Sequence, residues 1–524
     1  MSRFLLALCL LFCAAFARAA PDAAALRRLA EGDSGAKIAA IQELVRTGGA
    51  EAIPVLEAMA EDRLALAGET MVILEGGKAF DAVTGAAVEA ADAETVTVNN
   101  RLRGELGRAL AALRLFSADA ATRLAAAQSL QGQAGAAMAP LIARALEKEN
   151  DAKIRALLTL AHAQASLADA DPERRLAAVG ALAESSSPAV RGLLLPLTDK
   201  EKEADAGVRR AAAAAVKAID GRIALTENLG SVFSGLSLGS ILLLGALGLA
   251  VTYGVMGIIN MAHGELLMIG AYSAYAMQML FRRFFPEALD WYLPAAIPLA
   301  FLSAALIGAL MERTVIRWLY GRTLETLLAT WGLSLILIQT ARALFGAQNV
   351  EVANPGWMSG GVEILPNLLL PWNRVIIIGF ALCVLLLMWA LMNRTRLGMF
   401  VRAVTQNRAM AGCVGVPTGR VDTLAFALGA GIAGLGGLAL SQISNVGPDM
   451  GQGYIVDAFM VVVLGGVGQL AGAAWAALGL GVVTKLLEGW SGAVVAKIVV
   501  LAFIIVFIQK RPQGLFALKG RVLD

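Results

Sequence analysis

Nine apolar segments fill the sequence beyond Leu229 and constrain the fold more than any other feature. A membrane-spanning helix needs about 20 apolar residues, and hydrocarbon forces every backbone polar group to find a partner within the structure. The pattern therefore predicts an all-α polytopic membrane protein with about 8 to 9 transmembrane helices. One short segment predicts half of a broken helix that ends at Gly465 and Gly466. The segments are 232–257, 264–281, 294–311, 326–345, 374–392, 421–441, 455–466, 471–487 and 494–508.

The apolar residues are unevenly distributed, which indicates two regions in different surroundings. Hydrophobic residues make up 58% of the 524-residue chain and charged residues 16%, which is more apolar than an ordinary soluble protein. Between Pro21 and about Glu227, however, Ala, Arg, Glu and Asp are abundant. The formal net charge of +3 is small, and no basic stripe with interleaved aromatic residues occurs. Nucleic-acid binding therefore has little support.

The amino terminus has the features of an export signal. Arg3 is followed by an apolar stretch at 4–16 and by the small-residue pattern Ala17-Arg18-Ala19. This order predicts a signal peptide at 1–19. An uncleaved anchor helix is the alternative, and in either case the polar region that follows is exported.

Clusters of arginine predict the orientation of the membrane region, because cytoplasmic loops carry an excess of basic residues. Lys510 and Arg511 place the carboxy terminus, including a tail at 519–524, in the cytoplasm. An exported amino-terminal region then requires an odd number of crossings, which favours nine. The two clustered loops contain Arg313, Arg317 and Arg322, and Arg394, Arg396, Arg402 and Arg408.

The exported region at 20–228 predicts an α-helical domain built from HEAT-like helix pairs. Short phrases with a basic residue in the first or second position recur at the start of apolar periodic stretches. Stacked helix pairs of this kind bury each apolar face on the next pair. The interval from Arg123 to Arg175 is longer than a typical HEAT period. β-Branched residues at 70–85 and 94–100 predict a small β insertion. The phrases start at Lys37, Arg123, Lys153, Arg175 and Val208, with partner helices near Ile53, Met138 and Val190. The expected role of this domain is either a docking or regulatory surface or an extension that stabilises the protein.

Cysteine and histidine are too few for several kinds of chemistry. Cys9 and Cys13 lie in the predicted signal, and no pair has metal-ligand spacing. His162 and His263 fall in different regions, so no metal site is expected. The phosphate-binding pattern G-x-x-x-x-G-K-[ST] does not occur. No cofactor is therefore expected in this chain, and any ATP is bound by partner subunits.

Polar residues interrupt the first apolar segments. Asn260, His263 and Glu265 follow Gly257 at membrane depth, where an ionisable side chain is a functional-site candidate by default. The alternative is structural: Asn260 and His263 satisfy backbone groups freed by the helix break, and Glu265 favours a helix start. Both interpretations stay open. Weaker pathway candidates are Thr252, Tyr253, Thr330, Ser334, Gln339, Gln442 and Asp457.

The region from about 229 to 518 resembles the branched-chain amino-acid type of ABC-importer permease. The resemblance is carried by the run from Leu238 to Tyr272 with its Asn260-Met-Ala-His-Gly-Glu265 motif. It is also carried by Leu464-Gly-Gly-Val-Gly468 and Arg511-Pro-Gln-Gly514. The Asn260 motif and the long exported extension together resemble the urea-importing branch of that family most.

A basic stretch at 395–412, here called the coupling segment, resembles the part of such permeases that contacts the ATPases. A short exposed helix that offers apolar side chains suits a partner groove. The apolar contacts expected within it are Leu397, Phe400, Val401, Met410 and Ala411. A purely topogenic basic loop is the alternative. The resemblance implies coupling roles for Arg394, Arg402, Asn407, Met410, Ala411 and Gly415.

The resemblance implies a permease subunit, and not an enzyme, in the bacterial inner membrane with its amino-terminal domain in the periplasm. The expected partners are a second homologous permease, two cytoplasmic ATPases, an extracytoplasmic solute-binding protein and membrane lipid. Urea is the expected solute, and branched-chain amino acids or short amides are the alternative. A membrane-anchored HEAT-like sensor or docking protein is the alternative from another class.

Overall fold

The computed structural model describes residues 23–516, apart from 48, 69, 77, 89–92, 132, 136 and 137. The predicted signal peptide at 1–19 and the predicted tail at 519–524 lie outside the described residues. The chain divides into two compact units, Met1–Ala224 and Leu225–Asp524. The boundary falls within one helix, α11 (Ala206–Met256).

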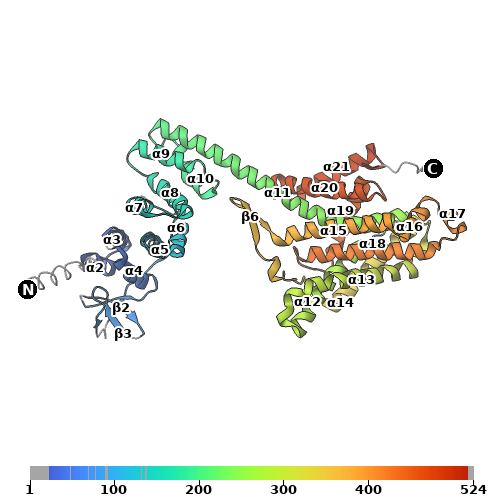
Figure 1. Cartoon of the computed structure of the whole chain (residues 1–524), viewed down its shortest axis with the longest axis horizontal. Coiled ribbons are helices and arrows are strands. Elements are labelled where there is room, and N and C mark those ends of the chain that lie inside the picture. Colours follow the sequence, from blue (N-terminus) through green and yellow to red (C-terminus); the bar gives the residue numbers. More distant parts are fainter. Residues whose placement is uncertain are drawn as a thin grey trace, which may run out of the picture. The chain divides into compact units, whose positions relative to one another are not determined.

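The first unit consists mostly of short helices (Figure 1). Successive helices pack on one another, and their inward faces form one apolar core that includes Leu44, Leu106 and Ile142. A second core brings together Leu182, Leu194 and Ile219. The helices are α2 (Ala23–Glu31), α3 (Ser34–Thr47), η1 (Gly49–Ala52), α4 (Ile53–Ala60), α5 (Asn100–Arg114), α6 (Ala120–Ser129), α7 (Ala139–Lys148), α8 (Ala152–Ser166), α9 (Pro172–Leu182), α10 (Pro188–Leu194) and η3 (Leu195–Thr198).

The recurring basic phrases each follow an aspartate that caps a helix. In every case the Asp carboxylate accepts a hydrogen bond from a backbone N–H two or three residues later, which satisfies a donor that has no partner within the helix. A basic residue stands four positions after the aspartate. The pairs are Asp33 and Lys37, Asp119 and Arg123, Asp151 and Arg155, Asp171 and Arg175, and Asp205 and Arg209.

These caps explain the long interval between Arg123 and Arg175. The structure places an additional capped helix, α8, inside that interval. This helix interrupts the expected succession of helix pairs. It has its own aspartate cap, but no short partner helix lies between it and α9. The phrase at Lys153 correctly predicted the start of this helix, but the spacing of the phrases did not show that it lacks a short partner.

Two ion pairs join successive parts of this unit. Arg123 donates from Nε to Glu149 at 2.8 Å, and Arg175 donates from Nη2 to Glu203 at 2.7 Å. Both carboxylates are almost fully buried. The hydrogen bond from Arg175 holds the pKa of Glu203 below its usual value of 4.5, and Arg123 does the same for Glu149. Each ion pair therefore ties one capped helix to the chain just before a later capped helix.

Replacing Glu203 with glutamine is expected to loosen the helices around it. A lowered pKa stabilises the folded state above pH 4.5 and loses that effect as the pH falls through the folded-state pKa. Hydrogen exchange in the full chain checks this: backbone amides of α9 should exchange about tenfold faster at neutral pH in Glu203→Gln. The variant should also show less acid sensitivity than the natural chain. Glu173→Gln, a change at an exposed residue of the same helix, serves as the control.

The predicted β insertion is a small antiparallel sheet with strand order β4-β3-β2-β1-β5. Met71 and Val72 of β2 are buried on opposite faces of the sheet, and Phe80 of β3 pairs with Ile73 of β2. The first strand, with the sequence Leu-Ala-Leu-Ala, has no turn signal of its own and was not predicted. The strands are β1 (Leu64–Ala67), β2 (Thr70–Glu75), β3 (Lys78–Asp81), β4 (Ala87–Val88) and β5 (Glu94–Thr95).

The second unit is a bundle of long helices with a short hairpin. Each of the nine predicted apolar segments lies in a helix, and the predicted break after α19 occurs at Gly466, where φ is +99°. The elements after α11 are α12 (His263–Phe284), η4 (Pro286–Trp291), α13 (Tyr292–Thr314), η5 (Ile316–Leu319), α14 (Thr323–Phe345), η6 (Gly356–Met358), β6 (Gly361–Leu365), β7 (Leu368–Pro371), α15 (Trp372–Arg394), α16 (Arg396–Gln406), α17 (Arg408–Cys413), α18 (Thr418–Ser441), α19 (Met450–Gly465), α20 (Leu470–Ser491) and α21 (Ala493–Lys510).

Among the described residues, seven helices are long and apolar enough to cross a membrane. The expectation of eight or nine spans is therefore corrected. The helix α19 has only 16 residues, and α12 carries His263, Glu265 and Gln278 along its length. Both helices are present, but neither meets the length and composition of a spanning segment.

Helices α12, α13 and α18 form the centre of this unit. Figure 1 shows α13 and α18 running side by side, and α18 is the most buried of the seven candidate spans. Backbones touch directly: a Cβ atom on Gly270 would lie 1.9 Å from the Gly434 carbonyl oxygen, and one on Gly437 would lie 1.7 Å from that of Leu267. Glycine allows this close approach between membrane helices.

Candidate solute pathway and coupling surface

The predicted polar break is a true interruption between two helices. The helix α11 ends at Met256, Gly257 has a φ of +68°, and α12 begins at His263. Glycine adopts this left-handed backbone without strain. The intervening residues place Asn260, His263 and Glu265 in the interior, each at most 2% exposed.

Part of each polar side chain satisfies the surrounding backbone. The Asn260 side-chain oxygen accepts a hydrogen bond from the Ala262 N–H at 3.1 Å. His263 Nε2 lies 3.0 Å from the Gly245 carbonyl oxygen of α11. These contacts agree with the structural interpretation of the break. Asn260 Nδ2 and His263 Nδ1, however, have no hydrogen-bond partner.

Glu265 is hydrogen-bonded to α14, whereas His263 contacts α11. Its Oε1 accepts a hydrogen bond from the Ser334 hydroxyl of α14 at 2.7 Å, while its Oε2 has no partner. Thr330, one turn before Ser334, accepts a hydrogen bond from the Met261 N–H at 3.2 Å. The start of α12 is therefore attached to α14 by polar contacts.

The structure divides the predicted polar group. Residues two positions apart in a helix do not face each other, so His263 contacts α11 while Glu265 contacts α14. Thr252 donates its hydroxyl to carbonyls of its own helix, at Gly248 and Leu249. Tyr253 packs edge-on against Phe459. Neither Thr252 nor Tyr253 makes a side-chain hydrogen bond toward Asn260.

Two further polar side chains of α12 were missed by the sequence analysis. Tyr272 and Gln278 are buried, and Tyr272 Oη and Gln278 Oε1 lack partners. Tyr272 stands seven positions after Glu265 and therefore on the same helix face. Its ring stacks on Phe345 of α14 with centroids 4.5 Å apart. The seven-residue spacing is the sequence signal that would have identified Tyr272.

The helix α14 contributes a matching stripe. Its buried residues are Thr326, Thr330, Ser334, Ile338 and Ala341, which recur every three or four positions. The first three carry hydroxyl groups, and the remainder of the helix surface is largely exposed. Ser and Thr are common where membrane helices pack, and the Thr326 and Thr330 hydroxyls donate to carbonyls one turn earlier in the chain. On the facing side of α12, however, Glu265 Oε2 and Tyr272 Oη are buried polar atoms without partners. The face between α12 and α14 is therefore the candidate solute pathway.

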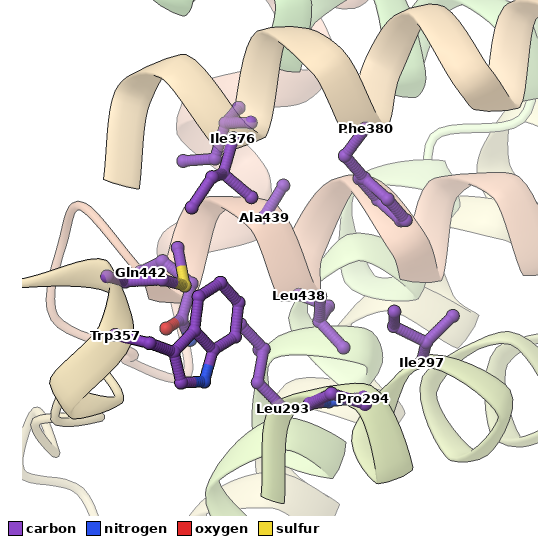
Figure 2. A pocket seen from close by; sticks show the side chains of 11 residues that line it. Leu293, Pro294, Ile297, Trp357, Ile376, Phe380, Leu438, Ala439 and Gln442 are labelled. Atoms are coloured by element: carbon purple, nitrogen blue, oxygen red, sulfur yellow. The ribbon is translucent and has the colours of Figure 1, made fainter. Parts of the chain in front are cut away.

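A small apolar cavity lies at the start of α13. Its volume is about 90 Å³, and Gln442 is its one amide-bearing lining residue. Figure 2 shows Ile376 and Phe380 projecting from α15 toward α18. Tyr292 donates its hydroxyl to the Ala353 carbonyl at 2.7 Å, and its oxygen lies 3.2 Å from Gln442 Oε1. The remaining lining residues are Leu293, Pro294, Ile297, Trp357, Met358, Ile377, Leu438 and Ala439.

The coupling segment forms two short helices, α16 and α17. Asn407 caps α17, accepting a hydrogen bond from the Met410 N–H at 3.0 Å. Gly415, just beyond the coupling segment, has a φ of +88°. Arg394 is exposed, and Arg402 donates to the carbonyl of Met392 at the end of α15. Arg402 therefore also anchors α16 on its own chain.

The apolar contacts expected for a partner need correction. Val401 and Ala411 are buried, 7% and 4% exposed, because α16 and α17 pack on α18 and its neighbours. Leu397 and Phe400 are half-buried against the same core. Met410 is exposed as expected, and the exposed Met399 and Val414 were missed. An amphipathic helix can contact a partner only through the residues that are not already buried against its own chain.

Met410→Asp is expected to weaken contact with an ATPase without disturbing the fold. Met410 is 61% exposed, so a carboxylate there remains solvated, whereas it would be unpaired in an apolar partner groove. In the assembled complex, solute-stimulated ATP hydrolysis should fall about tenfold. Met410→Leu, which keeps the apolar surface, should retain it. Equal stimulation in both variants would remove Met410 from the contact surface.

Comparison with known proteins places this architecture in a family. A family model described as "Branched-chain amino acid transport system / permease component" matches residues 231–508. The chain belongs to this family. As a branched-chain amino acid permease family member with several apolar helices, it is a multi-pass inner-membrane protein and a permease component of a transport system.

Individual members of the permease family match along almost their whole length. The chain is 30% identical over 298 residues to the high-affinity branched-chain amino acid transport system permease protein LivH of Salmonella typhimurium and to that of Escherichia coli. These alignments cover 55% of this chain and 94% of each relative. The permease protein BraD of Pseudomonas aeruginosa is 28% identical over 293 residues, covering 55% and 95%. No solved structure matches the chain significantly.

Proposed function

We propose that this chain is the transmembrane permease subunit of an ATP-driven importer whose solute is urea. The face between α12 and α14 supplies the pathway, and the coupling segment receives the ATPases. The sequence contains no phosphate-binding loop, so hydrolysis takes place on partner subunits. A second homologous permease, two ATPases and an extracytoplasmic solute-binding protein complete the proposed complex.

The observation that carries the choice of urea is the set of buried polar atoms with unused hydrogen-bonding capacity. On the face between α12 and α14, Glu265 Oε2 is an acceptor and Tyr272 Oη serves as donor or acceptor, and Asn260 Nδ2 is a donor in the break just before α12. Urea presents one carbonyl acceptor and four N–H donors and has no net charge. Its groups match such a mixed set, and no counter-ion is needed.

An amino acid needs different hydrogen-bonding partners, because it carries two charged groups. Its carboxylate and ammonium groups each need a charged or strongly hydrogen-bonding partner when they leave water. Among the described buried residues of the membrane unit, the charged side chains are Glu265, Glu312 and Asp422, all of them acidic. A buried cation that would bind a carboxylate is not among them, which favours the uncharged solute.

A branched-chain amino acid is the second candidate, and a specific observation favours it. The cavity in Figure 2 is lined by aliphatic and aromatic side chains, including Trp357, Ile376 and Phe380. Such a surface suits an aliphatic side chain. The family members that match this chain are also named for branched-chain amino acids.

We further infer that the amino-terminal unit is exported and lies outside the cytoplasm, as a docking surface for the solute-binding protein or as a stabilising extension. The signal-like sequence at 1–19 and the HEAT-like succession of capped helices support this inference. A sensor or docking role without transport would leave uptake unchanged when the chain is removed.

Uptake of labelled urea at low concentration tests the proposal. Cells that lack this chain should lose uptake, and the full chain should restore it. Unlabelled urea, but not excess leucine, should compete in the restored cells. Unchanged urea uptake in the deletion strain would exclude urea as the solute. Loss of labelled leucine uptake in the same strain, restored by the full chain, would establish the second candidate.

A further inference from the structure

Two of the three buried acidic side chains of the membrane unit lie together behind α17. Glu312 of α13 and Asp422 of α18 are fully buried. An unpaired carboxylate is costly to bury, so this pair of positions requires partners. Neither Glu312 nor Asp422 was predicted from the sequence to be functional.

A chain of contacts connects these carboxylates to the coupling segment. Arg408, the first residue of α17, forms an ion pair with Asp422, and its guanidinium lies 4.8 Å from the centroid of the Tyr320 ring. The Tyr320 hydroxyl donates to Glu312 at 3.1 Å. Thr423 donates its hydroxyl to the other Glu312 oxygen at 2.6 Å. These five residues are here called the Arg408 cluster.

The cluster restrains how α17 moves. If α17 separated from α18, Asp422 would lose its hydrogen-bonded countercharge while it remained buried, and breaking one partner of a buried pair is strongly destabilising. Arg317, which lies against Gly419 of α18, is a second cation nearby, but no hydrogen bond connects it to Asp422. A displacement of α17 is therefore transferred to α18.

The helix α18 leads from this cluster to the polar break. Gly429 lies two turns beyond Asp422, and a Cβ atom there would be 2.5 Å from the Gly248 carbonyl oxygen of α11. A Cβ atom on Gly248 would in turn lie 3.1 Å from Cε1 of His263. Because packed interiors are nearly incompressible, movement of one of these backbones displaces the other by a similar amount.

We propose that the Arg408 cluster couples the ATPases to the solute pathway, with Arg408, Asp422, Tyr320 and Glu312 acting as positioning residues. Movement of α17 passes through the ion pair to α18 and then to the start of α12. The proposal rests on the proposed function as a permease subunit. It does not depend on which solute is carried.

The test measures solute uptake and ATP hydrolysis together in proteoliposomes that contain the complete complex. Asp422→Asn keeps the size of the side chain and removes its charge. Uptake per ATP hydrolysed should fall about tenfold, with solute-stimulated hydrolysis retained, since such couplings span about 0.5 to 2 kcal/mol. Arg408→Gln should have the same effect. The double variant should be no worse than either single one, because both act through one contact.

A merely structural role predicts a different result. Fewer complexes would then assemble, and uptake and hydrolysis would fall in proportion, leaving their ratio unchanged. Tyr320→Phe provides a milder variant: it keeps the ring beneath Arg408 and removes the link to Glu312, and the ratio should fall about threefold. Lys485→Gln breaks an ion pair within α20 and should leave the ratio unaltered.

An unchanged ratio in Tyr320→Phe and in whichever of Asp422→Asn and Arg408→Gln assembles would overturn the proposal. The assay is run with both urea and leucine. If the natural complex carries leucine and not urea, the urea assignment fails, and the ratio for leucine still decides whether the Arg408 cluster couples the two processes.

Discussion

Gly437→Val is expected to prevent the membrane unit from folding. The first side-chain carbon would lie 1.7 Å from the Leu267 carbonyl oxygen and 3.0 Å from the Ala271 nitrogen. Both are backbone atoms of α12, so the overlap is relieved only if α12 and α18 separate. Separation would break the tightest contact in the unit, at a cost above about 4 kcal/mol. Fluorescence-monitored size-exclusion chromatography of detergent extracts should show loss of the monodisperse peak.

Gly479→Val is the matched control for this experiment. Gly479 lies in the interior of α20, and a side-chain carbon there would meet no atom within 4 Å. The intrinsic cost of placing valine in a helix is the same at both sites, so any difference reports the contact with α12. A normal elution profile for Gly437→Val would mean that α12 and α18 do not approach so closely in the membrane.

Glu265→Gln is expected to lower solute uptake by about tenfold or more while the complex still assembles. The glutamine carbonyl can still accept the hydrogen bond from Ser334, which anchors α12 to α14. The change therefore alters mainly Oε2, an acceptor that becomes an N–H donor. A solute that donates hydrogen bonds to this position would then meet a second donor. Uptake by proteoliposomes, normalised to assembled complex, measures the effect.

Glu325→Gln makes the same chemical change at an exposed position of α14 and should leave uptake as in the natural chain. If Glu265→Gln and Glu325→Gln transported equally well, Glu265 would be a structural residue at a helix start. The face between α12 and α14 would then no longer be the candidate pathway.

Local sequence patterns anticipated most of the helices. The apolar segments fell in helices because most of them are long, and two of them end at Gly257 and Gly466, where the backbone turns with positive φ. Two of the nine segments, those in α12 and α19, do not have the length and composition of a spanning helix. In α12, the polar residues that face the protein interior also lower the mean hydropathy of the helix. Hydropathy along the sequence does not show whether a polar residue faces the protein or the lipid.

The sites were less predictable, because their contacts join residues far apart in the chain. Thr423 and Glu312 are 111 positions apart, and Ser334 and Glu265 are 69 apart. No local period relates such pairs. Val401 and Ala411 looked available to a partner because a helix sequence shows its apolar face but does not show what already covers that face. Arg408 looked like a topogenic charge until Asp422 and Tyr320 were found beside it.

The unequal attachment of α14 limits how the permease opens and closes. Three central helices touch through backbone, whereas α14 is attached mainly along one stripe and is bounded by Gly321 and Gly346, which both have positive φ. Over a transport cycle, the three central helices are expected to move together as one rigid body when α17 displaces α18. The helix α14, with a glycine of positive φ at each end, is then expected to change its position relative to that body and to expose the solute first to one side of the membrane and then to the other.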